Sequence, residues 1–223
     1  MIPAASSTPA ASPTAPQRNR GERNCNPAGM SLLALIREDL RNHDGNPFEQ
    51  GFWAIAVHRF GNWRMGIRFK ILRAPFTLLY RFLFKWVEWT CGITLPYTVV
   101  LGRRVRIWHH GGMILHAHSI GDDVHIRQNT TFGVVRRNEN YQIPTIGDRV
   151  EIGCGVCVLG PVTVGHDSAI GANAVVLRDV PPHALAVGVP ARIIERRAEA
   201  DSSLSSTIPS PRVPKQTGRE STT

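Results

Sequence analysis

The chain has 223 residues, of which 42% are hydrophobic, and this is enough for one mid-sized domain with its own core. Its 26 Lys and Arg against 17 Asp and Glu leave a formal net charge of +9. This charge favours an anionic partner, such as a phosphate-rich cofactor or an acidic membrane face. No nucleic-acid-binding motif accompanies the charge, so no nucleic acid is expected as a partner. Four cysteines are too few for a disulfide scaffold at this length.

Both ends of the chain are predicted to be disordered tails. Residues 1–29 are rich in Ala, Pro, Ser and Thr and lack the apolar segment of a secretory signal. Met30 is an alternative natural start. Residues 198–223 are again rich in Ser, Thr and Pro. Free thiols and no export signal predict a cytoplasmic protein.

Residues 30–91 are predicted to form an α-helical domain. Apolar residues recur at helical spacing from Leu32 to Leu40, and Asn46-Pro47 marks a turn. The helices expected after that turn cover about 48–62, 63–73 and 75–91, with a break near Pro75.

The apolar stretch from Ala74 to Leu95 comes closest to a membrane span. It contains Arg81, Lys85 and Glu88, and each of these is costly at the centre of a bilayer. A buried or surface-lying helix is therefore expected. An ordinary packing helix is the commoner case. The alternative is peripheral contact with the anionic inner face of a membrane.

A six-residue repeat begins after Gly92. This period suits short strands, three to a coil, with one aliphatic residue of each strand pointing into a prism-shaped core. It predicts a left-handed parallel β-helix over 92–197. Glycine often follows the aliphatic residue, where a turn is expected to need relaxed backbone angles. The main series is Ile146, Ile152, Val158, Val164, Ile170 and Val176; a second runs Val150, Val156, Val162, Ser168, Ala174 and Val180; Leu95, Leu101, Ile107 and Met113, then Ile120, Ile126 and Phe132, keep the period upstream.

An inserted loop is predicted near Val134–Thr145. The spacing from Phe132 to Ile146 is fourteen residues rather than twelve, and loops that leave a solenoid often carry function. Its polar residues Arg136, Arg137 and Asn138 are expected either to contact a sugar or to be solvated.

Four segments resemble the hexapeptide-repeat acyltransferases, within the serine acetyltransferase-like branch. That branch includes the acetyltransferases of exopolysaccharide gene clusters, such as those for colanic acid. The resemblance covers about residues 30–195. The segments are GITLP at 92–96, IWHHGG at 107–112, IRQNTTFG at 126–133 and VGVPAR at 187–192.

The resemblance implies an O-acetyltransferase with acetyl-CoA as co-substrate and no metal. It implies a homotrimer with active sites between neighbouring β-helices and acetyl-CoA lying along the coils. Small residues then let the pantetheine arm approach the backbone, although turn chemistry explains the glycines equally. The cofactor-binding residues that the resemblance implies are Gly133, Gly153, Cys154, Gly171 and Ala172, and Arg192 is a candidate for a CoA phosphate.

The resemblance also implies a histidine general base in the IWHHGG segment. A hydroxyl is a poor nucleophile at neutral pH, and histidine titrates close enough to that pH to take its proton. His109 matches the family position by a count without gaps from Gly92, and the repeat from Leu95 to Met113 favours it; His110 is the alternative. The serine enzymes place an Asp fifteen residues before this histidine, where the present chain has Thr94.

The acceptor is predicted from the inserted loop. The serine enzymes carry an Arg-His-Pro run there, and the matching residues in this chain are Gln142-Ile143-Pro144. Since the carboxylate of serine needs a cationic partner, a sugar hydroxyl of an exopolysaccharide or of its precursor is the expected acceptor. Serine is the alternative small-molecule acceptor.

Three other interpretations compete with acetyl transfer. The Cys154–Cys157 pair has redox spacing but lacks a thioredoxin-like context. A non-catalytic scaffold is the second. The third is a metal-dependent β-helix enzyme, because three-histidine zinc enzymes share this fold; the candidate histidines are His109, His110, His116, His118 and His125, which are too compact in sequence to match that pattern.

Overall fold

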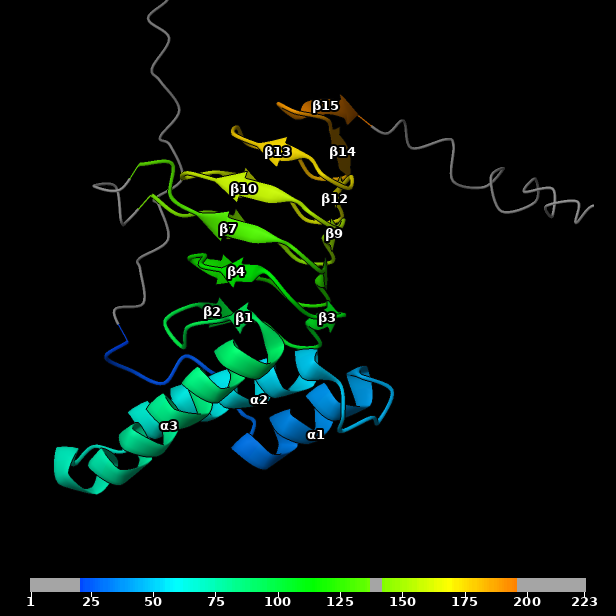
Figure 1. Ribbon diagram of the computed structural model, residues 1–223. Coiled ribbons are helices and arrows are strands. Elements are labelled where there is room, and N and C mark those ends of the chain that lie inside the picture. The colour runs from blue at the N-terminus through cyan, green and yellow to red at the C-terminus, as the bar shows by residue number, and fades with distance from the viewer. Residues whose placement is uncertain (1–20, 137–141, 196–223) are drawn as a thin grey trace, which may run out of the picture.

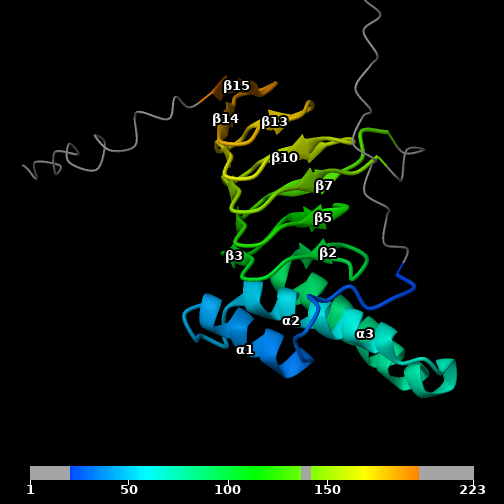
Figure 2. The same cartoon turned by 180° about the vertical axis from the view of Figure 1, so that it is seen from behind.

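The computed structural model describes residues 21–136 and 142–195. Helices α1, α2 and α3 form a layer on which the coils of a parallel β-helix are stacked (Figure 1). The view from behind shows the same layer beneath the first coil, with β14 and β15 at the opposite end (Figure 2). The predicted order, helices followed by a β-helix, is confirmed.

The helical segment consists of α1 (Leu32–Asn42), α2 (Gln50–Trp63), the 3-10 helix η1 (Arg64–Gly66) and α3 (Lys70–Cys91). Ser31 caps α1, because its hydroxyl accepts the Ala34 N–H at 3.2 Å. Gly92 ends α3 with a φ of 63°, which a residue without a Cβ adopts easily.

The predicted break near Pro75 is wrong, because α3 runs through this residue as one helix. A proline inside a helix removes one backbone hydrogen bond, here the one that the Ile71 carbonyl would accept. Aromatic packing of the residues that follow Pro75 offsets this loss. Phe76 contacts Trp63 with ring centroids 5.5 Å apart, and Tyr80 contacts Tyr97 at 5.3 Å.

Residues 21–29 also differ from the predicted disordered tail. The Cys25 N–H donates to Asn62 Oδ1 at 3.1 Å, and Asn26 Nδ2 donates to the Arg59 carbonyl at 2.9 Å. These hydrogen bonds hold the segment against α2. They are made by polar groups, so the hydrophobic pattern of the chain carries no sign of them.

The β-helix has three parallel sheets that form the sides of the prism. The first sheet is β1-β4-β7-β10-β13, the second is β2-β5-β8-β11, and the third is β3-β6-β9-β12-β14, which β15 extends antiparallel to β14. The strands are β1 (Ile93–Thr94), β2 (Val100–Leu101), β3 (Arg106–Trp108), β4 (Met113–Leu115), β5 (Ser119–Ile120), β6 (His125–Arg127), β7 (Thr131–Gly133), β8 (Thr145–Ile146), β9 (Glu151–Ile152), β10 (Cys157–Leu159), β11 (Thr163–Val164), β12 (Ala169–Ile170), β13 (Val175–Val176), β14 (Ala184–Val187) and β15 (Arg192–Glu195).

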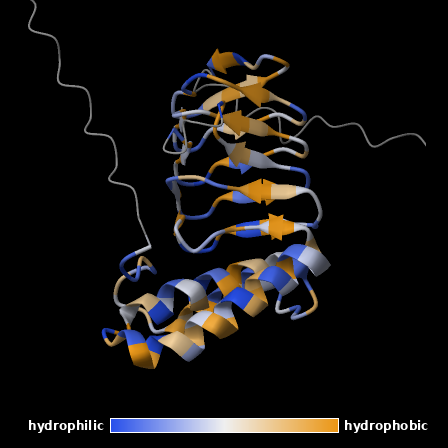
Figure 3. Ribbon diagram, turned by 60° about the vertical axis from the view of Figure 1, so that its left-hand side comes forward, coloured by the Kyte–Doolittle hydropathy of each residue, from blue (hydrophilic) through white to orange (hydrophobic). Residues whose placement is uncertain are grey.

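The six-residue repeat predicts the core correctly. Every member of the series from Ile146 to Val176 is at most 2% exposed, and every member of the second series is at most 4% exposed. Hydrophobic residues accordingly recur on the strands of successive coils (Figure 3). Burying one aliphatic side chain per strand stabilises each by about 1.5–3 kcal/mol relative to exposure.

Two details of the repeat need correction. Met113 is buried, but it is not the next repeat position after Ile107: it pairs with Ile93, while Leu115, which is also buried, pairs with Phe132. The turn after β3 is therefore two residues longer than the repeat predicts. The inserted loop is also longer than expected, since Phe132 to Ile146 takes fourteen residues where the matching step from Val158 to Val164 takes six.

The glycines of the repeat are needed for close approach, and the prediction that they relax the turn is wrong. A Cβ on Gly102 would lie 2.4 Å from the backbone of Gly121, and a Cβ on Gly147 would lie 2.8 Å from the backbone of His166. Neither glycine has a positive φ. The left-handed residue of each of these turns comes two positions later, as at Arg104 and Arg149, both with φ of 53°.

Polar side chains of α2 cover the open end of the first coil. His58 Nε2 lies 2.9 Å from the Val99 carbonyl, and Asn62 Nδ2 donates to the Tyr97 carbonyl at 2.8 Å. Arg59 donates to the carbonyls of Leu101 and Gly102 at 2.9 and 2.6 Å. An open sheet edge leaves unpaired backbone groups, and α2 supplies their partners.

We expect the buried imidazole of His58 to make the protein less stable in mild acid. Burial lowers the pKa of His58 from 6.5 to about 3, so the folded state holds this ring neutral. Its contribution to stability is complete above pH 6.5 and declines as the pH falls from there toward 3, by up to about 1.4 kcal/mol per pH unit. Burial lowers the pKa of His43 as well.

Urea unfolding between about pH 7.5 and about pH 5 measures this loss. His58→Gln keeps an N–H donor for the Val99 carbonyl and removes the titration, so its stability should depend less on pH. A variant as acid-sensitive as the parent protein would contradict the assignment.

Candidate functional site

Turns between the third and the first sheet stack along one edge of the prism, here called the histidine edge. It comprises the turns 109–112, 128–130, 153–156 and 171–174. Backbone hydrogen bonds connect these turns to one another and to the end of α3. The bonds are Gly111 N–H to Cys91 O at 3.1 Å, Asn129 N–H to Gly111 O at 3.2 Å, Gly155 N–H to Gln128 O at 3.0 Å and Asn173 N–H to Cys154 O at 2.8 Å.

His109 and His110 begin the lowest turn of this edge, and both are exposed. The long turn after β3 puts them at a corner, where His109 has a φ of 63°. The repeat is regular through Ile107 only, so the unbroken register to Met113 that favoured His109 does not hold. The choice of base between the two histidines stays a prediction.

Thr94 lies beside this turn and has a carboxylate partner that the sequence did not reveal. Thr94 pairs in register with Ile114 of β4, just beyond the histidine turn. Its Oγ1 donates to Glu88 Oε1 at 3.2 Å. Glu88 sits in the last turn of α3, where a negative charge is unfavourable against the helix dipole; this placement was the one signal available in the sequence.

Four of the five residues predicted to bind the cofactor come together on the histidine edge. Gly153 and Cys154 lie two coils from the histidine turn, and Gly171 and Ala172 lie three coils from it, so the separations are about 10 and 14 Å. A Cβ on Gly153 would lie 2.6 Å from Ala172 N, so coil stacking alone requires this glycine. Gly133 lies at the opposite end of its strand, away from this edge. Arg192 is exposed at the start of β15.

Two more side chains near the histidine turn offer unused polar atoms. Trp108 Nε1 and Gln128 Oε1 are buried and have no hydrogen-bond partner within the described residues. Trp108 directly precedes His109, and its ring carries the Arg106 guanidinium at 3.7 Å from the centroid. Such atoms supply one donor and one acceptor to a bound ligand.

The described part of the inserted loop carries one cation, Arg136. Ile143 is 2% exposed and so points into the core, and the Pro144 carbonyl accepts the His118 N–H at 2.8 Å. Gln142 and Arg136 are exposed. Arg137 and Asn138 lie outside the described residues.

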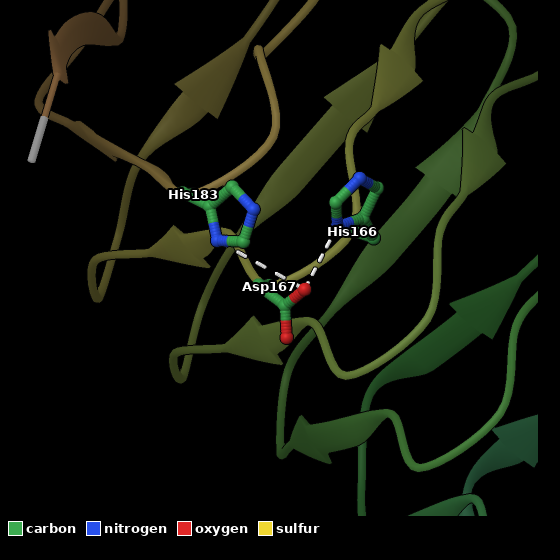
Figure 4. Close-up of side chains that lie close together, drawn as sticks. All are labelled: His166, Asp167 and His183. Carbon is green, nitrogen blue, oxygen red and sulfur yellow. Dashed lines mark hydrogen bonds and ion pairs between the residues drawn. The ribbon is translucent and has the colours of Figure 1, made fainter. Parts of the chain in front are cut away.

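The candidate metal ligands of the sequence do not assemble. Among the described residues, one group of three potential ligands lies close enough for a metal, namely His166, Asp167 and His183 (Figure 4). His166 Nδ1 lies 2.7 Å and His183 Nδ1 lies 3.9 Å from Asp167 Oδ2. All three come from turns between the second and the third sheet, so they lie on a different edge from His109.

Arg149 explains this cluster without a metal. Its guanidinium binds both carboxylate oxygens of Asp167, at 2.6 and 2.8 Å, and would repel a cation there. Arg149 and His166 together hold the pKa of Asp167 well below its usual range. Two coils closer to the helices, Arg104 binds Asp123 in the same bidentate way. A series of ion pairs therefore runs along this edge.

The four cysteines are free thiols. Cys154 stands in a turn of the histidine edge, and Cys157 pairs in register with Thr131 and Val175.

Comparison with known proteins agrees with this architecture. Residues 143–178 match the family model described as bacterial transferase hexapeptide (six repeats). The chain superposes on the structure of soybean serine acetyltransferase complexed with serine with a TM-score of 0.62 and 28% identity, covering 74% of this chain and 70% of that one.

Two curated relatives are named serine acetyltransferase. The protein of Mycobacterium tuberculosis is 39% identical over 147 residues, which are 65% of this chain, and the match spans only 60% of that protein's length. The protein of Bacillus pumilus is 33% identical over 168 residues, covering 73% of this chain and 77% of the relative. The chain therefore belongs to the serine acetyltransferase family of hexapeptide-repeat proteins.

Proposed function

We propose that this chain transfers an acetyl group from acetyl-CoA to the hydroxyl of L-serine. The observation that carries the proposal is the histidine edge, where two exposed histidines share one face with a strip of small residues. The names of the relatives favour serine over the exopolysaccharide acceptor that the sequence resemblance suggested.

The residues of the histidine edge have different roles in the proposed reaction. Acetyl-CoA supplies the activated thioester, and the small residues Gly153, Cys154, Gly171 and Ala172 leave room for its extended arm. His109 or His110 takes the proton of the acceptor hydroxyl as its oxygen attacks the thioester carbonyl. The same imidazolium then returns the proton to the sulfur that leaves. A turn N–H of this edge stabilises the oxyanion that forms.

A sugar hydroxyl is the second candidate acceptor. The observation that favours it lies at 142–144, where the serine enzymes carry Arg-His-Pro: this chain has Gln142 and the buried Ile143, and neither offers a cation to the carboxylate of an amino acid. The acceptor Gln128 Oε1 suits a hydroxyl group, which can donate a hydrogen bond, better than a carboxylate, which cannot.

Release of the free CoA thiol from acetyl-CoA tests the function and separates the two acceptors. L-serine and a panel of hexoses and nucleotide sugars are compared at equal concentration. Release that depends on serine supports the proposal, and release that depends on a sugar alone supports the second candidate. No release with any acceptor above the no-acceptor blank would contradict both.

We further propose that the chain assembles as a homotrimer, in which the histidine edge faces a neighbouring β-helix. The exposure of His109 and His110 in the single chain supports this, because catalysis by general bases is favoured in sites shielded from water. Sedimentation equilibrium gives the mass directly, and a monomer at assay concentration would contradict the proposal.

We propose, finally, that α3 brings the protein to an anionic membrane face. Within the described residues, no helix is long and apolar enough to cross a membrane. The outer face of α3 nevertheless exposes large apolar side chains, and Arg68, Lys70, Arg81 and Lys85 are exposed on or next to the helix. This combination is typical of helices that lie in a membrane interface. The apolar residues are Ile71, Leu72, Leu78, Leu79, Phe82, Trp86 and Trp89, which are 38–87% exposed.

We expect the protein to sediment with vesicles that contain phosphatidylglycerol and not with vesicles of phosphatidylcholine alone. Replacing Ile71 and Phe82 by Glu should abolish binding, since both side chains would enter the interface. Leu33→Glu, which changes an exposed apolar residue of α1, is the matched control and should bind normally. Equal binding by all variants would contradict the assignment, as would a smaller assembly of the Ile71/Phe82 variant, which would show that a second copy covers the face.

A further inference from the structure

Glu88 occupies an unusual place for a carboxylate. It lies in the last turn of α3, where the helix dipole disfavours negative charge, and only 19% of its side chain is exposed. Its Oε2 pairs with Lys85 Nζ at 2.5 Å, but that lysine side chain is 60% exposed, so the pair stabilises little. Its Oε1 accepts a hydrogen bond from the Thr94 hydroxyl. The position therefore needs a reason other than helix stability.

The Glu88–Thr94 pair lies at the base of the histidine edge. The end of α3 contacts the histidine turn directly, because Gly111 N–H donates to the Cys91 carbonyl at 3.1 Å and Met113 N–H donates to the Gly92 carbonyl at 2.9 Å. A Cβ on Gly92 would lie 3.1 Å from the Gly111 Cα, which shows how closely the two segments pack. Thr94 follows Gly92 by two residues, on the strand that pairs with β4.

We propose that Glu88 is a positioning residue that acts through Thr94 on the general base of the histidine turn, an inference that rests on the acetyl transfer proposed above. A threonine hydroxyl has one proton and two lone pairs. Since the Thr94 hydroxyl donates its hydrogen bond to Glu88, the Thr94 oxygen is left as an acceptor and receives a hydrogen bond from the N–H of the imidazole. The other ring nitrogen is then free to take the proton of the acceptor hydroxyl, and the carboxylate behind Thr94 offsets the charge of the imidazolium.

Removing this carboxylate should affect turnover more than cofactor binding. We expect Glu88→Gln to lower kcat by about 10- to 100-fold, by analogy with the loss of groups that orient metal-bound histidines, with KM for acetyl-CoA nearly unchanged. The acidic limb of the pH–rate profile should shift to lower pH, because the imidazolium loses a nearby negative charge. Thr94→Val should have a similar effect, and the double variant should be little worse than either single one.

A rescue experiment separates positioning from a structural role. Thr94→Asp places a carboxylate at position 94 itself, which is closer to the histidine turn than Glu88. It should therefore restore most of the activity in the Glu88→Gln background. Glu195→Gln removes an equal charge at the far end of the β-helix and serves as the control. Thermal unfolding confirms that each variant is folded. A Glu88→Gln enzyme with unchanged kcat and pH profile, or a Glu88→Gln/Thr94→Asp enzyme no more active than Glu88→Gln alone, would overturn the proposal.

NMR spectra of the histidine ring protons give a readout that needs no turnover. Glu88→Gln should change the ring-proton chemical shifts of one histidine of the turn, His109 or His110, and leave those of His183 in place. If the parent protein is inactive but this shift is found, the positioning stands and the acetyl transfer fails. If the parent is active and neither histidine shifts, the positioning fails and the acetyl transfer stands.

Discussion

Replacing the general base of the histidine turn by asparagine should lower kcat for acetyl transfer by about 10²–10⁴-fold. Asparagine keeps the polarity of histidine and accepts no proton at neutral pH. It also suits the backbone, because His109 has a φ of 63°, a conformation that Asn adopts at lower cost than Ala. A loss of activity in His109→Asn therefore reports the missing base and not a strained turn.

His110→Asn is the matched partner of that variant. The two side chains are adjacent and both exposed. If one of them is the base, replacing the other should lower kcat much less. Stopped assays of CoA thiol release, with KM measured for both substrates, assign the base. The observation that would sink the assignment is full activity in both variants, since the proton would then have to go to a group outside the turn.

Arg59→Met should be the most destabilising single change in the helical segment. Arg59 and Asp39 are both fully buried, and Arg59 Nε lies 3.0 Å from Asp39 Oδ2. The same guanidinium also donates to the carbonyls of Leu101 and Gly102. Removing it leaves a buried carboxylate without its partner, which typically costs about 3–5 kcal/mol, and strands two carbonyls of the first coil as well.

Urea unfolding monitored by tryptophan fluorescence measures this loss. Arg149→Gln is the control, because its ion pair with Asp167 is largely exposed, with side-chain exposures of 54% and 29%, and should contribute about 1 kcal/mol or less. The double change Arg59→Met with Asp39→Leu should recover part of the stability, since no unpaired charge remains. If Arg59→Met were no more destabilising than Arg149→Gln, Arg59 would not hold α2 to the β-helix.

The core of this protein is visible in its sequence, because each coil repeats the same local rule. One aliphatic residue per strand must point inward, so the spacing from Ile146 to Val176 is enough to predict the β-helix and its buried column. The small residues of the histidine edge, such as Gly153 and Ala172, follow from the same repeat. Their predicted roles rest on resemblance, since the same small residues satisfy coil stacking.

The features that interrupt the repeat were decided by tertiary structure. Leu115 and not Met113 takes the repeat position because the turn after β3 is two residues longer than the repeat predicts, and only the pairing with Phe132 reveals it; both side chains are buried. Helix α3 continues through Pro75 because aromatic packing outweighs one lost hydrogen bond. Neither outcome follows from local propensity, since both depend on contacts with segments distant in sequence.

The same reason explains what the sequence left open at the candidate site. From the sequence, Thr94 stands where the family pattern has an acid, and Glu88 is one charge on a basic helix. The two side chains meet because α3 ends at Gly92 and the chain turns directly into β1, which lies beside the histidine turn. Periodicity describes the helix and the β-helix separately, each with its own spacing. Where one meets the other is set by packing, and that junction is where the structure adds Glu88 to the site.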